Sequence, residues 1–231
     1  MQITIYTETI WPSIHAALNH LQQQRVDNLS QQVAAGINFS IILGSACYLE
    51  GVLETGLKAI LSHQSANKGK IEELEKRRSF NLFYNGLIED IERRISNATG
   101  TDGYDPIFML LVGKKLSQLK TVVPLWEGIT VLFQVRNVLG HGRAVTAQKI
   151  DAYWVREGED ERFSGGYRRA EDYLRKKKLV HKRFFEAHSD YLFLSDAVAD
   201  HFWKLAQVTP VAIAESLDGE AAAIFKRAVL S

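Results

Sequence analysis

Apolar positions recur at three- and four-residue intervals along three long stretches of this chain, which predicts three amphipathic core helices. They cover residues 37–61, 70–96 and 124–139. In the first, a single stripe of apolar side chains runs along one helix face: Ile42, Ala46, Leu49, Leu53, Leu57 and Ile60. The pattern therefore predicts an all-α fold, an up-down helical bundle whose neighbouring helices are joined by short loops.

The flanking segments complete one predicted domain over residues 1–231. Residues 1–36 form an N-terminal extension, with a helix from Pro12 to about Asn28. The stretch 97–105, rich in Gly, Asp, Thr and Asn, predicts a loop before a helix over 106–119. Helical periodicity is lost over 144–188, which we interpret as a partly irregular insertion with a candidate strand at 150–155. It resumes in C-terminal helices over 189–231.

Composition narrows the functional classes. The net charge of +1 over 231 residues argues against a general nucleic-acid coat, which usually shows a marked basic excess. The single cysteine, Cys47, excludes an intramolecular disulfide and a multi-cysteine metal site, and its apolar neighbours predict that it is buried. The sequence contains no phosphate-binding glycine loop, zinc-protease motif or nucleophile elbow, so we expect no metal and no cofactor.

The start of the chain lacks a secretory signal pattern, and no uninterrupted apolar run approaches the ~18 residues that span a bilayer. We therefore expect a cytoplasmic protein without a membrane partner.

The strongest candidate chemistry lies where the helix over 124–139 ends. Arg136 and Asn137 fall in its last turn, and Gly140 and Gly142 flank His141. Glycine tolerates the left-handed conformation that ends helices, so His141 is free to fold back toward Arg136. Arg183 and His188 repeat the spacing without the asparagine or the glycines. The local chemistry alone fits a phosphodiester-cleaving site and an ordinary helix cap about equally well.

This combination resembles the signature of the HEPN superfamily, an arginine followed by a polar residue and then a histidine four to six positions after the arginine. The segment from Ser45 to Glu54 is similar to the early helix of that family, and the resemblance in organisation covers roughly residues 35 to 210. It implies a HEPN-like bundle and a metal-independent endoribonuclease, often a toxin or defence effector. Some members of the family serve only as binding modules.

The resemblance assigns Arg136 and His141 to catalysis and Asn137 to positioning, and it implies a homodimer in which two motifs meet. A homodimer would also supply the second proton-transfer group that one histidine cannot provide. We expect RNA as the substrate, and an antitoxin or another protein as a further partner. The competing interpretation is a non-catalytic HEPN-like interaction module, in which Arg136 and Asn137 hold structure and His141 is incidental.

Basic residues after the motif are candidates for substrate binding. The run 168–178 could bind a phosphate backbone while Tyr167 and Tyr173 stack on bases. The alternative interpretation is a solvent-exposed helix without a role in binding. The substrate-binding residues we predict are Arg143, Arg168, Arg169, Lys176 and Lys177. Glu50 and Glu54 could also hold Arg136 inside the bundle through a bidentate contact.

Overall fold

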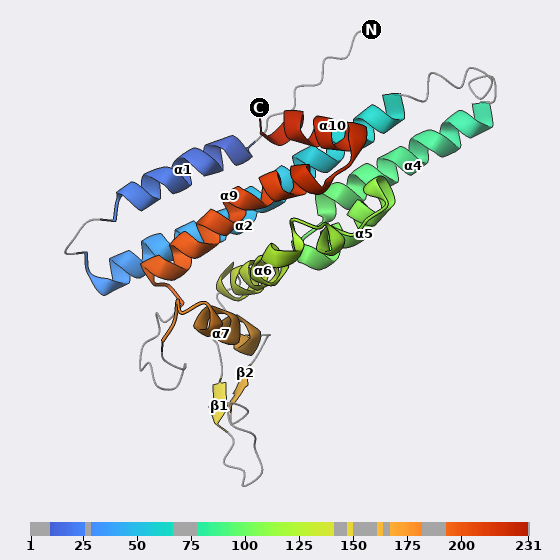
Figure 1. Ribbon diagram of the computed structural model, residues 1–231. Helices are drawn as coiled ribbons and strands as arrows, with labels where there is room; N and C mark the ends of the chain where they lie inside the picture. Colours follow the sequence, from blue (N-terminus) through green and yellow to red (C-terminus); the bar gives the residue numbers. More distant parts are fainter. Residues whose placement is uncertain are drawn as a thin grey trace. The chain divides into compact units, whose positions relative to one another are not determined.

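A computed structural model describes residues 10–25, 29–66, 78–140, 147–149, 161–163, 167–181 and 193–230. It confirms that the protein is all-α, with one short two-stranded ribbon among the described residues (Figure 1). The helices are α1 (Trp11–Gln23), α2 (Gln31–Ala66), α4 (Arg78–Asn97), α5 (Gly100–Val112), α6 (Trp126–Gly140), α7 (Tyr167–Lys176), α9 (Asp196–Ser216) and α10 (Gly219–Val229). Two 3₁₀ turns, Leu116–Gln118 and Val123–Leu125, lie between α5 and α6.

The ribbon falls in the predicted insertion. Strand β1 (Ala147–Lys149) pairs antiparallel with β2 (Glu161–Phe163), with Gln148 opposite Arg162. The predicted strand over 150–155 lies outside the described residues.

Two of the predicted core helices are confirmed with small changes at their ends. Helix α2 begins six residues before the predicted residue 37, and its whole predicted stripe is at most 1% exposed. Helix α6 begins at Trp126 and ends at Gly140, within two residues of the prediction. The described part of the third helix, α4, runs from Arg78 to Asn97. Periodicity therefore locates α2 and α6 because each buries a continuous apolar face.

The prediction around α5 is wrong at both ends. The helix begins at Gly100, inside the predicted loop, and ends at Val112 instead of Leu119. Its first turn is stabilised by Glu50, whose carboxylate accepts a hydrogen bond from the Gly100 N–H at 3.0 Å. It stops at Val112 because Gly113 takes the left-handed conformation, with φ of 76°, and caps the Met109 carbonyl.

The chain divides into two compact units. The first contains residues 1–13, 48–126 and 207–231, and the second contains residues 14–47 and 127–206. In the first unit, α5 packs beside α4, and Phe225 of α10 fills the space left by Gly56. In the second unit, Leu18 of α1 packs on Gly44 of α2, so the predicted N-terminal extension contributes to the core. Whether these units form one domain stays a prediction.

The expectation that Cys47 is buried is wrong, because its side chain is exposed. Ala46, the preceding residue, is fully buried. Successive residues on an α-helix are rotated by about 100°, so a position next to the apolar stripe can face away from it.

Helix α2 also has the length and composition of a membrane span over Gln31–Ser65, with a mean hydropathy of 1.4 in its most apolar window. An uninterrupted apolar run, the feature sought in the sequence, does not reveal this. Core helices of water-soluble proteins meet the same criteria, and 44% of that window is buried within the protein.

Candidate functional site

The last turn of α6 carries the described part of the predicted motif. Val131, Leu132 and Val135 are buried and anchor this end of the helix in the second unit. Gly140 is the last helical residue and does not take the left-handed conformation that we expected of it. His141 and Arg143 lie outside the described residues, so the approach of His141 to Arg136 stays a prediction.

Arg136 and Asn137 have different surroundings. The Arg136 guanidinium carbon lies 5.6 Å from the centroid of the Phe133 ring, and that ring is itself only 3% exposed. This cation–π contact holds the half-buried arginine against the helix. Asn137, one residue further on, is exposed to solvent. The helix therefore fixes the arginine and presents the amide outward, a suitable arrangement for a residue that binds an anion and a neighbour that positions it.

The predicted contact of Glu50 and Glu54 with Arg136 stays untested. In the first unit, Glu50 caps α5 as described above. Glu54 forms an ion pair with Lys58 at 2.7 Å and accepts a hydrogen bond from Ser96. Both carboxylates thus have structural roles within that unit.

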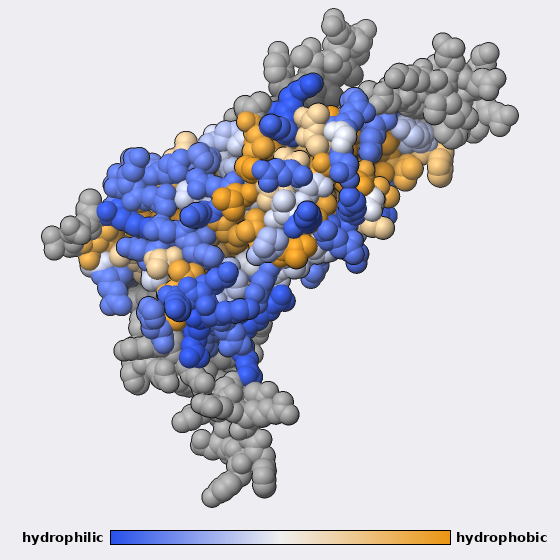
Figure 2. All heavy atoms as spheres, in the orientation of Figure 1, coloured by the Kyte–Doolittle hydropathy of each residue, from blue (hydrophilic) through white to orange (hydrophobic). Residues whose placement is uncertain are grey.

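A second group of predicted site residues meets at the start of α6. One open hollow of about 480 Å³ is lined by Glu127 of α6 and by five residues on one face of α7: Arg168, Arg169, Asp172, Tyr173 and Lys176. Lys177 lies beside it, with its ammonium 5.8 Å from the centroid of the Tyr173 ring. Figure 2 shows strongly hydrophilic side chains gathered over α7. Four of the five predicted substrate-binding residues therefore lie together, and the fifth, Arg143, is not described.

The prediction that Tyr167 and Tyr173 stack on bases is wrong. The side chains are 6% and 4% exposed. Tyr167 packs edge-on against Phe193, with ring centroids 4.4 Å apart, and the Tyr173 hydroxyl hydrogen-bonds His201 Nε2 at 2.8 Å. The two rings belong to the core that holds α7 in place, and they do not offer faces to a ligand.

Burial also changes the ionisation of this core. It raises the pKa of Tyr173 to about 12, with a further contribution from the charge of Glu127, and it raises the pKa of Tyr167. Burial lowers the pKa of His201, and the nearby charge of Lys177 lowers it further. The sequence gives no local signal for this contact, because Tyr173 lies 28 residues from His201.

The basic hollow and the motif lie at opposite ends of α6. Glu127 is in its first turn and Arg136 is nine residues further on. At 1.5 Å per residue, the two lie about 14 Å apart along the helix axis. A ligand that contacts both must therefore be extended.

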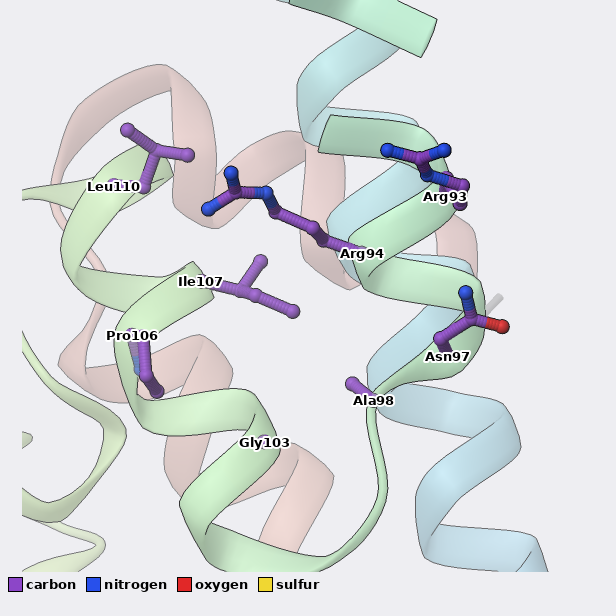
Figure 3. A pocket seen from close by; sticks show the side chains of 8 residues that line it. All are labelled: Arg93, Arg94, Asn97, Ala98, Gly103, Pro106, Ile107 and Leu110. Carbon is purple, nitrogen blue, oxygen red and sulfur yellow. The ribbon is translucent and has the colours of Figure 1, made fainter. Parts of the chain in front are cut away.

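The first unit contains a further hollow, of about 320 Å³, between α4 and α5. Figure 3 shows Arg94 reaching from α4 toward Ile107 and Leu110 of α5, while Arg93 points away. Asp90 accepts hydrogen bonds from both arginines, which lowers the pKa of its carboxyl. Three large apolar side chains nearby in the chain are exposed: Phe83, Leu87 and Leu110. This hollow combines apolar walls with charge and resembles a binding surface more than a catalytic centre.

Comparison of the chain with protein-family models, curated proteins and solved structures gives no match. Within the described ranges, no three His, Cys, Asp or Glu side chains lie close enough together to hold a metal ion.

Proposed function

We propose that this protein is a metal-independent endoribonuclease of the HEPN type, in which Arg136 and His141 act in catalysis and Asn137 positions them or the substrate. One observation supports this most directly. Helix α6 ends at Gly140, immediately before His141, with Asn137 exposed and Arg136 held against Phe133 in the same last turn. Arg136 and Asn137 thus lie in one helical turn at the end of α6, where Asn137 can meet an anionic ligand from solvent, and His141 follows Gly140 in the sequence.

The chemistry requires little machinery, because RNA supplies its own nucleophile. The ribose 2′-oxygen attacks phosphorus as a base removes its proton, the bond from phosphorus to the 5′-oxygen breaks, and an acid protonates the departing oxygen. Histidine, with an ordinary pKa near 6.5, serves as base or acid at neutral pH. Arginine offers a planar fork of donors to the phosphorane oxygens and stays charged throughout. The products are a 2′,3′-cyclic phosphate and a 5′-hydroxyl.

The proposal includes a homodimer of HEPN-like bundles in the cytoplasm. One motif supplies one histidine, whereas acid and base act best from separate groups. A two-fold axis beside the end of α6 would bring two motifs to a shared groove. A toxin or defence role, with an antitoxin or other protein as partner, follows from the family resemblance.

The test is incubation of the purified full-length chain with mixed RNA in EDTA, with detection of 2′,3′-cyclic phosphate ends. Replacing His141 with Ala should slow cleavage by at least the ~10²–10⁴-fold typical of lost acid–base catalysis. Arg136→Lys should also impair cleavage, since an ammonium cannot form the bidentate contact. The control is a variant with both Arg183 and His188 replaced by Ala. These two residues repeat the spacing of Arg136 and His141, and their replacement should slow cleavage much less. Cleavage by the His141 variant at the wild-type rate would refute the assignment.

The alternative function, a non-catalytic HEPN-like interaction module, draws support from the exposed apolar residues of α4 and α5. Phe83 is 70% exposed and Leu110 57%. Figure 2 shows apolar surface among the side chains over these helices. An inactive wild-type chain that binds a protein through this surface would favour the module over the enzyme.

A further inference from the structure

The basic hollow beside α7 is lined by three cations and two carboxylates. Its cations come from one helix face, at positions 168, 169 and 176, so they span about 12 Å along α7. Two carboxylates lie near these cations: Asp172 is 3.9 Å from Arg168, and Glu127 is 3.8 Å from Lys176. The Lys176 side chain is 74% exposed. Arg169 is also exposed, so Arg169 and Lys176 present their charges to solvent, where a ligand can reach them.

The buried face of α7, opposite the cations, is packed against neighbouring residues. Ala170, Tyr173 and Leu174 are buried, and the Tyr173 hydroxyl is held by His201. On α6, only glycine at position 128 leaves room for that hydroxyl, because an added Cβ would lie 2.4 Å from it. These contacts hold α7 in place, so ligand binding does not require α7 to be ordered first.

The end of α7 carries a further lysine in an unusual backbone conformation. Lys178 has φ of 60°, and it is the one residue other than glycine with a positive φ in the described parts of the chain. It occupies the position after the helix at which glycine is preferred, and the hydrogen bonds from Leu179 to Leu174 and from Lys178 to Arg175 complete a Schellman motif. Lys178 is exposed, so it adds a further cation at the end of α7.

Among the described residues that line the hollow, the one aromatic side chain, Tyr173, is buried. Both tyrosines of α7 are buried, so the surface of the hollow offers charge and hydrogen-bond donors rather than aromatic faces. Such a surface contacts phosphates, and the contact carries no sequence information. The hollow lies about 14 Å from Arg136 along the axis of α6, so a strand that contacts both must span at least that distance.

We propose that the α7 hollow binds the phosphodiester backbone of single-stranded RNA at a point on the strand separate from the point of cleavage. The inference rests on the proposed function for the identity of the polyanion. A single strand is favoured because a row of cations this short contacts one strand, whereas modules that bind double-stranded RNA extend over about 16 base pairs. In-line attack by the 2′-hydroxyl also requires a strand that can leave the stacked A-form geometry.

The experiment measures binding separately from cleavage. A 12-nucleotide fluorescent RNA is titrated with the full-length His141→Ala chain, and anisotropy is followed at several salt concentrations. The same chain is then tested with Arg169→Glu and Lys176→Glu together. Its matched control combines Lys204→Glu and Lys226→Glu, two exposed lysines elsewhere that change the net charge equally. Arg169→Gln with Lys176→Gln provides a milder variant, and circular dichroism verifies that every variant is folded.

We expect the α7 variant to weaken binding at least tenfold and the control less than threefold. The slope of log K against log salt should fall by about 1.4, or 0.7 for each phosphate of a single strand that no longer meets a cation. Equal weakening by both variants would overturn the proposal, because it would reduce the effect to net charge. Tighter binding of duplex RNA, or of vesicles rich in phosphatidylserine, would also overturn it.

The two proposals fail in distinguishable ways. If the wild-type chain does not cut RNA but the α7 variant loses RNA binding, the catalytic assignment fails and the binding site stands. If RNA is cut and the α7 variant binds and cuts it like the wild type, the binding site fails and the catalytic assignment stands.

Discussion

Replacing Gly128 with Ala should destabilise the protein although alanine is the better helix former. In an exposed helix interior this substitution stabilises by about 1 kcal/mol. At Gly128, however, the new methyl would lie 2.4 Å from the Tyr173 hydroxyl oxygen and 2.9 Å from Leu205 Cδ2. A tyrosine hydroxyl cannot move without its ring, so α7 or the ring must shift. Such overpacking costs about 1–3 kcal/mol, and loss of the hydrogen bond to His201 adds about 1 kcal/mol.

The net expectation is a loss of roughly 1–3 kcal/mol, measured as the free energy of unfolding in urea. In a chain of 231 residues this lowers Tm by roughly 2–4 °C for each kcal/mol. Gly36 of α2 is the matched control, because an added Cβ there meets nothing within 4 Å; Gly36→Ala should stabilise. Equal stability of the two variants would refute the packing argument. In a Tyr173→Phe background, Gly128→Ala should cost at least about 0.5 kcal/mol less, since the closest atom is gone.

Two further predictions concern the same region. Lys178→Gly should raise the free energy of unfolding by about 1 kcal/mol by removing left-handed strain, whereas Lys178→Ala should not; equal effects would contradict the strain. The lowered pKa of His201 means that the unfolded chain binds a proton first as the pH falls below 6.5. Stability from this group is therefore present above pH 6.5 and is lost as the pH falls through the lowered pKa. His201→Gln should remove that part of the pH dependence, and an unchanged profile would count against it.

The elements visible in the sequence are those whose cause is local. Helices α2 and α6 each bury a continuous apolar face, so the three- and four-residue spacing located them. The predicted start of α5 was wrong because the helix start depends on Glu50, a residue 50 positions away. The Glu50 carboxylate accepts a hydrogen bond from the Gly100 N–H. Glycine, aspartate and threonine around residue 101 are typical of a loop, and the hydrogen bond to the distant carboxylate supports a helix start there instead.

The features of the candidate site that the sequence predicted are likewise those with a local cause. The end of α6 beside Asn137 followed from the pattern of apolar residues before it and the glycines after it. The orientation of Tyr173 did not, because its hydroxyl is directed by His201 and by the space above Gly128. The basic run alone could not distinguish a stacking surface from a core face that carries cations at its edge. To distinguish the two, one must know which face of α7 packs against its neighbouring helices.

The exposure of Cys47 affects how the oligomeric state must be measured. With one cysteine in the chain, oxidation can form a disulfide only between two molecules. A sample stored in air would then contain a covalent pair joined through α2, which sedimentation would count as a dimer. Such a pair would persist in denaturant and dissociate on reduction. A non-covalent dimer formed at the end of α6 would dissociate in denaturant and persist on reduction. Measurements in the presence of a reductant, or with Cys47→Ser, separate the two.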